Sequence, residues 1–127
     1  MSNLPYAIEF HDSVIESITQ KNESIIVRLS YAYIHKEGKG WSQVAEIHFG
    51  NAGSVSEKVE FPAVVSDATL TTGQKVYNNL LELPLSCQGA VNLEIILNSG
   101  LAFTIKGNGV SVALFGEPEF IENVSVT

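Results

Sequence analysis

The chain has one cysteine, few basic residues and no long apolar run, and each shortage excludes something. Cys87 has no partner for an intramolecular disulfide, so the sequence does not require an oxidising compartment. No stretch approaches the ~20 apolar residues of a membrane span. Residues 1–10 also lack the basic start and apolar run of a secretory signal. We therefore expect a cytoplasmic protein with no membrane partner.

Basic side chains are too few and too scattered for a nucleic-acid-binding surface. The sequence has seven Lys and Arg against 14 Asp and Glu, a formal net charge of −7. Phosphate recognition needs clustered Lys and Arg, and no two of the seven are adjacent. An anionic membrane surface is disfavoured for the same reason. The acidity suits either plain solubility or a basic protein partner.

The motifs of several common catalytic designs are also missing. The sequence contains no Walker A motif, no G-x-S-x-G elbow, no HExxH pair and no His-x-His pair of the cupin type. Cys87 has no histidine beside it in the sequence, so we interpret it as a small buried apolar side chain. These absences favour a binding module over an enzyme, and we expect no cofactor.

Alternation of apolar and polar residues with a period of two dominates what is present. In residues 91–97 the odd positions are apolar, so their side chains share one face of a strand. Asn98-Ser99-Gly100 predicts a turn into a second strand over 101–106. Gly107-Asn108-Gly109 predicts another turn, into a third strand over 110–115. We expect these segments to form three sequential antiparallel strands.

The first half of the chain shows the same alternation. Residues 24–35 are rich in β-branched and aromatic residues and predict one long strand, with Tyr31 and Tyr33 on its apolar face. The charged, Gly-rich segment 36–40 predicts a turn. A further strand is expected over 41–49, because apolar and polar residues alternate there too.

Other segments are less regular. Residues 54–61 predict a weaker strand that Pro62 stops, and 119–126 predict a last strand at a sheet edge. Residues 13–16 match a capping box, but the β-branched residues that follow favour a strand ending in a turn before Ser24. Residues 73–83 have apolar positions at helical spacing before Pro84, which fits one helix turn or a polar crossover.

About ten short strands in one chain of ordinary domain length predict an all-β fold. A single open sheet would leave one apolar face uncovered, and the sequence offers at most one short helix to cover it. We therefore predict one antiparallel β-sandwich or small jelly roll over residues 1–127.

The segment Glu9-Phe10-His11-Asp12-Ser13 resembles the opening of small uncharacterised bacterial β-sandwich proteins with an FHDS-like motif. Residues 14–18, Leu83-Pro84-Leu85, Gly107-Asn108-Gly109 and Phe115-Gly116-Glu117 are similar to later parts of those proteins. Some immunity proteins that neutralise bacterial toxins share the FHDS-like start. The resemblance implies a bacterial β-sandwich, and it transfers no catalytic residue.

Two Glu/His pairs suggest a metal site. Glu9 and His11 are two residues apart, as are Glu46 and His48. Residues two apart share a strand face, so two such pairs on neighbouring strands would supply two histidines and two carboxylates. Solvent-facing strand positions show the same alternation without any metal. A metal-binding protein or metal-dependent enzyme is thus one alternative function. His11-Asp12 alone fits a general base or, with Ser13, a turn.

A second alternative is a carbohydrate-binding module. Trp41, Tyr31, Tyr33 and Tyr77 could stack on sugar rings if they share one exposed surface. Aromatic side chains more often fill the core of a sandwich. An exposed tryptophan that responds to sugars would separate the two interpretations.

The C-terminal end is acidic. Glu117, Glu119 and Glu122 lie there, and no basic residue follows Lys106. Charge on an edge strand discourages edge-to-edge aggregation, and it also suits docking of a basic protein. We predict a non-enzymatic, protein-binding module, with a toxin-immunity inhibitor as the special case that the resemblance suggests. A homodimer through sheet edges is compatible with a sandwich, but no residue favours it.

Overall fold

The computed structural model describes residues 7–36, 38–52, 59–73 and 75–123. These residues form one antiparallel sheet of eight strands, with no helix in the described ranges, and hence no helix there that could span a membrane. The strands are β1 (Ala7–Lys21), β2 (Ser24–Lys36), β3 (Lys39–Phe49), β4 (Ala63–Thr71), β5 (Val76–Asn78), β6 (Leu80–Glu82), β7 (Ser86–Leu97) and β8 (Ala102–Asn123). The predicted all-β, sandwich-like fold is confirmed.

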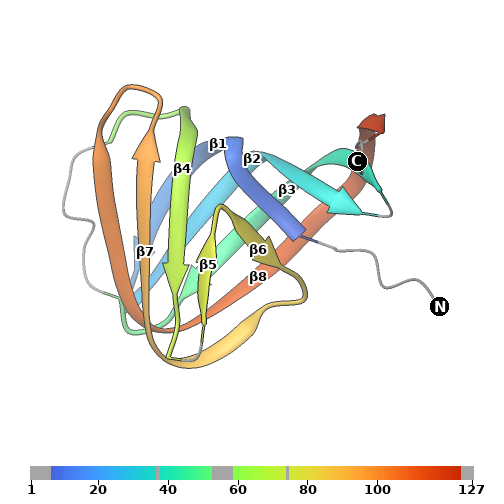
Figure 1. Ribbon diagram of the computed structural model, residues 1–127. Coiled ribbons are helices and arrows are strands. Elements are labelled where there is room, and N and C mark those ends of the chain that lie inside the picture. The colour runs from blue at the N-terminus through green and yellow to red at the C-terminus, as the bar shows by residue number, and fades with distance from the viewer. Residues whose placement is uncertain (1–6, 37, 53–58, 74, 124–127) are drawn as a thin grey trace.

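The sheet curls over on itself, so that β4 and β7 lie across from β1, β2 and β3 (Figure 1). The strand order is β5-β4-β7-β8-β3-β2-β1-β6, and β4 also pairs with β1. That additional pairing is short: Val14 lies opposite Val64, and Ile15 lies opposite Ala63. It closes six strands, in the order β4-β7-β8-β3-β2-β1, into a ring around a single core.

The core is filled from the inward face of every long strand. Alternating positions are buried along β3 and β7, as the period of two predicts. Burying one large apolar side chain contributes about 1.5–3 kcal/mol, and this term drives the curling of the sheet. The largest fully buried side chains are Phe10, Phe49, Ile8, Ile15, Ile25, Leu29, Ile34, Ile47, Leu70, Leu81, Leu93 and Ile95.

Several predicted strands and turns are confirmed. Residues 91–97 lie in β7, and 98–100 form the turn into β8. The interpretation of residues 13–16 as strand is correct, because they lie inside β1. The turn before Ser24 is also present, with Asn22 at a positive φ of 57°.

The predicted turn at Gly107-Asn108-Gly109 is wrong, because β8 runs through it without a break. The Asn108 amide donates to the Gly50 carbonyl at 2.7 Å, and the Gly50 amide donates to the Gly109 carbonyl at 3.1 Å. A Cβ placed on Gly107 would lie 2.8 Å from the Gly50 carbonyl oxygen. Gly107 therefore serves close backbone approach, and Gly109 supplies a φ of 103°, with no reversal of the chain at either residue.

The predicted apolar face of β2 is wrong in its second half. Ladder pairing is irregular between Leu29 and Ala32, and the buried positions change there from odd to even numbers. Tyr31 and Tyr33 consequently face outward and are half-buried. A bulge of this kind cannot be recognised from alternation alone, because both sides of it alternate correctly.

Two other segments differ from the prediction, and the strand predicted over 119–126 is confirmed in its described part. Residues 73–83 contain the short strands β5 and β6 in place of a helix turn or crossover. Of 54–61, residues 54–58 lie outside the described ranges and 59–61 are not strand, whereas β4 begins directly after Pro62. Residues 119–123 form the end of β8, and 124–126 lie outside the described ranges.

Candidate functional site

The four residues Phe10-His11-Asp12-Ser13 build a bulge in β1. Glu9 lies opposite Tyr33 of β2, but the next ladder partner is Val14, opposite Tyr31. Four residues of β1 therefore face a single residue of β2. Asp12 has a φ of 70°, which is the left-handed conformation that aspartate tolerates better than most residues. Phe10 fills the core, while His11 and Asp12 are exposed.

Ser13 supplies the hydrogen bonds that the bulge removes from the ladder. Its hydroxyl donates to the Glu9 carbonyl at 2.7 Å and accepts from the Tyr33 amide at 3.2 Å. Ser13 is fully buried, so water cannot take its place. Two parts of the FHDS-like motif, Phe10 and Ser13, thus have a structural role.

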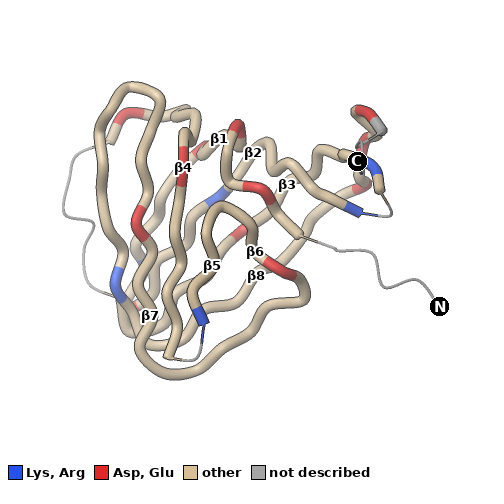
Figure 2. Tube along the Cα trace, viewed as in Figure 1, with Lys and Arg blue, Asp and Glu red and all other residues tan. Residues whose placement is uncertain are grey.

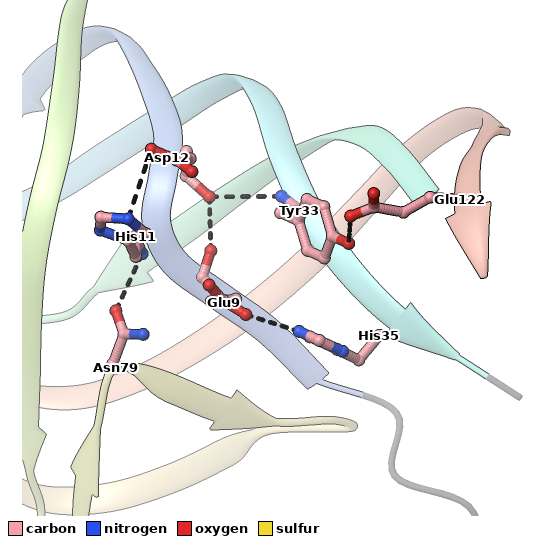
Figure 3. Close-up of polar contacts among 8 residues, drawn as sticks. Glu9, His11, Asp12, Tyr33, His35, Asn79 and Glu122 are labelled. Carbon is pink, nitrogen blue, oxygen red and sulfur yellow. Dashed lines mark hydrogen bonds and ion pairs between the residues drawn. The ribbon is translucent and has the colours of Figure 1, made fainter. Parts of the chain in front are cut away.

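His11 joins β1 to the strands on its outer side (Figure 3). Its amide donates to the Asn79 side-chain oxygen, and its ring Nδ1 donates to the Ser66 carbonyl, each at 2.8 Å. Nε2 lies 3.6 Å from Asp12 Oδ1. The hydrogen bond to Ser66 and the charge of Asp12 raise the pKa of His11. These contacts give His11 a structural role, because its exposed side chain connects β1 to β4 by a hydrogen bond.

The predicted site residue Glu9 pairs with His35, a residue that sequence reasoning missed. Glu9 Oε1 lies 2.6 Å from His35 Nε2 across the β1–β2 ladder. The ring of His35 lies 5.1 Å from that of Tyr33, between centroids. Tyr33 in turn donates its hydroxyl to Glu122 Oε2 at 2.5 Å. A row of polar side chains therefore runs from β1 to the end of β8 on the outer face (Figure 3).

Tyr33 reaches Glu122 because the intervening strand carries a glycine. A Cβ on Gly40 of β3 would lie 2.6 Å from Tyr33 Cζ. The ring thus lies flat over Gly40 and spans from β2 to β8. Burial and the hydrogen bond to Glu122 raise the pKa of Tyr33 well above its ordinary value. The hydroxyl therefore stays protonated and remains a donor, which does not suit a nucleophile or a base.

The second predicted pair, Glu46 and His48, belongs to a different network. Arg28 Nη1 lies 2.6 Å from Glu46 Oε2, and His48 Nε2 lies 2.9 Å from Glu46 Oε1. Burial alone would raise the pKa of Glu46, but the hydrogen bonds from Arg28 and His48 outweigh it and lower that pKa. Arg28 also lies over the Phe115 ring, 5.7 Å from its centroid. The carboxylate is fully engaged in holding β2, β3 and β8 together.

The two Glu/His pairs do not come together. Glu9 and His11 lie on β1, Glu46 and His48 lie on β3, and β2 separates these strands. The expectation that the pairs sit on neighbouring strands is therefore wrong. Within the described ranges, no group of three or more His, Cys, Asp or Glu residues could hold a metal ion.

Cys87 and His48 border the same shallow hollow, which has a volume of about 290 Å³. If both side chains faced this hollow, the His48 ring could act as a base for the Cys87 thiol. They face opposite sides of the sheet. Cys87 lies opposite the buried Val110, whereas His48 lies opposite Ser111, the next residue along β8. The geometry therefore does not assemble a Cys/His pair.

The four aromatic residues considered for sugar binding do not share a surface. Tyr31 and Tyr33 lie on the outer side of β2, while Trp41 shares the inner side with Ile34, its ladder partner. Tyr77 lies on β5, under the Lys75 ammonium at 4.9 Å. The tryptophan instead packs edge-on against Phe120 of β8, with centroids 5.5 Å apart.

The last part of β8 leaves the ring and becomes a strand with one partner. Residues 102–108 pair with β7, Val110 and Ser111 pair with both β7 and β3, and residues 113–123 pair only with β3 among the strands that the structure describes. We call residues 113–123 the β8 extension; Figure 1 shows it running beside β3. It is rich in exposed apolar side chains: Phe115 (42%), Phe120 (53%) and Ile121 (37%).

The acidic residues predicted for partner binding all lie on the β8 extension. Glu117, Glu119 and Glu122 are exposed, so carboxylates alternate with the exposed apolar residues. No family model matches the chain, and neither a curated protein nor a solved structure is significantly similar to it.

Proposed function

We propose that the chain is a non-enzymatic binding module that docks a basic protein on the β8 extension. The observation that carries this proposal is the combination of exposed phenylalanines and glutamates on a strand with one unpaired edge among the described residues. Soluble proteins rarely leave such a strand uncovered without a use for it. The short strand β6, by contrast, contains only Leu80–Glu82.

The charge distribution favours a basic partner. Basic positions are few and scattered along the described trace, as Figure 2 shows. The β8 extension itself carries three glutamates and no lysine or arginine. Lys39 of the β2–β3 hairpin lies opposite Asn123, the last residue of the extension, and Lys36 lies opposite Lys39, so the attraction is strongest away from that end, at Glu117 and Glu119. Complementary charge of this kind mainly accelerates association and selects the partner.

The polar network described above supports binding more than catalysis. Glu9 pairs with His35 and Tyr33 with Glu122, and the Tyr33 and His35 rings lie side by side between the two pairs. Such a network stiffens the outer face behind the β8 extension and thereby reduces the ordering cost of docking. We place this module in the bacterial cytoplasm, with a bacterial toxin as the special case of partner that the FHDS-like resemblance suggests.

Capture from a lysate of the source organism tests the proposal. The wild-type chain should retain a basic protein in stoichiometric amount at low salt and lose it at moderate salt. The variant Glu117→Lys/Glu119→Lys should lose that protein. The control Glu23→Lys/Glu94→Lys has the same net charge, changes exposed glutamates elsewhere and should keep it. Glu122→Gln tests the third glutamate, because an amide oxygen still accepts from Tyr33.

Equal retention by the wild type and both double variants would refute the β8 extension as the binding surface. Retention of no protein by the wild type at low salt would refute the binding module itself.

A further inference from the structure

The inner face of the sheet is progressively uncovered toward the β8 extension. One row of directly opposed side chains crosses five strands, Leu81–Ile8–Ile34–Trp41–Phe120. Leu81 and Ile8 are fully buried and Ile34 is 1% exposed, but Trp41 is only partly buried and Phe120 is 53% exposed. The row therefore ends in apolar surface beside a strand edge that pairs with no other described strand.

The opposite face of the same strands is polar and acidic at this end. The neighbouring row runs Leu80–Glu9–Tyr33–Ser42–Glu119, and Tyr33 reaches Glu122 on that side. The end of β8 thus presents an apolar side chain toward the inner face and carboxylates toward the outer face. A strand added beside it would place its own side chains alternately on these two faces.

We propose that a partner segment adds as an extended strand to the free edge of residues 119–123. This inference rests on the proposed function and names the chemistry of the segment: apolar residues alternating with lysine or arginine. The apolar residues extend the row beyond Phe120, and the basic residues lie beside Glu119 and Glu122. Cross-strand pairs of both kinds stabilise a sheet.

Two features limit the added strand to this stretch. Pro118 has no amide hydrogen to offer, and Gly116 has a φ of 74° within one of the two irregular parts of the β3–β8 ladder. The other irregular part is a single extra residue between Phe120 and Glu122, so an added strand must follow the same bulge. The chain upstream is therefore a poor template for strand pairing. Charge also disfavours a second copy of this chain as the occupant, because pairing β8 with itself would bring glutamates of the two copies together.

The test uses a short peptide of alternating Lys and Val with blocked ends, added to the full chain. Trp41 is the only tryptophan, and it packs against Phe120 in the apolar row, so its emission responds to a segment that covers Phe120. We expect binding that weakens with salt and shifts the Trp41 emission to shorter wavelength. Alternate N-methylation of the peptide should weaken binding about tenfold or more, because it removes the ladder donors.

Matched variants separate the two halves of the proposal. Phe120→Ser should weaken binding of the Lys/Val peptide about tenfold, whereas Val76→Ser, a similarly exposed position on β5, should not change it. Replacing Val by Ser in the peptide should have the same effect as Phe120→Ser.

Several results would overturn the inference. If the N-methylated peptide binds as tightly as its parent, the mode is not strand addition. If the Lys/Ser peptide binds equally well, or if Phe120→Ser has no effect, there is no apolar anchor, while acidic docking of a basic protein stands. If no peptide binds, or if the free chain is a dimer that buries Trp41, the proposed occupant is wrong. The lysate capture, which uses none of these peptides, judges the proposed function separately.

Discussion

Replacing Ser13 with alanine tests whether the bulge in β1 depends on one hydroxyl group. The change removes a single oxygen and leaves no sizeable cavity. It leaves the Tyr33 amide without its acceptor and the Glu9 carbonyl without its donor. Each unpaired buried group costs about 1–3 kcal/mol, so we expect Ser13→Ala to lower the free energy of unfolding by about 2–6 kcal/mol. That loss is a large fraction of the stability of an ordinary domain.

Urea unfolding measures the effect. With a slope of about 2 kcal/mol per molar urea, the midpoint should fall by roughly 1–3 M while the slope stays unchanged. Ser30→Ala, at an exposed position on the adjacent strand, should stay within about 0.5 kcal/mol of the wild type. Hydrogen exchange should accelerate at the Tyr33 amide. A loss below about 0.5 kcal/mol for Ser13→Ala would refute the reasoning.

Three further predictions follow from contacts already described. Gly107→Ala should destabilise the chain by about 1–3 kcal/mol in urea unfolding, because its Cβ would press on the Gly50 carbonyl. Tyr33 has a raised pKa when folded, so wild-type stability should fall as the pH rises above about 10, and Tyr33→Phe should remove that part of the fall in thermal scans. His11 also has a raised pKa when folded, so its contribution to stability is complete below about pH 6.5 and is lost as the pH rises through the folded pKa. The thermal midpoint of the wild type should therefore exceed that of His11→Asn at low pH, and this difference should shrink as the pH rises. A difference that stays constant with pH would contradict the prediction.

Regular strands were predictable because a one-sided core imposes alternation on the sequence. Residues 91–97 and 41–49 show this, since their inward positions are those found buried. Residues 73–83 were not predictable in the same way. Their helical spacing is coincidental, because Asn79, at a φ of 64°, turns the chain between β5 and β6 and bonds to the backbone of β1 and β4.

The candidate site was predictable only in part. The acidic residues of the β8 extension could be recognised because they cluster in the sequence. The pairing of Glu9 with His35 could not, because it depends on where the β1–β2 ladder resumes after the bulge. That offset is set by the conformation of Asp12 and by the Ser13 hydroxyl, and neither leaves a periodic signal in the sequence.

The bulges of β1 and β2 have a consequence for insertions and deletions. They lie side by side, and at both the buried positions change between even and odd numbers. If one residue between Phe10 and Val14 were lost, the part of β1 before the bulge would point its apolar side chains outward while the part after it still pointed them into the core. Single-residue length changes should therefore be tolerated in the turns at either end of β2 and eliminated by selection within the two bulges.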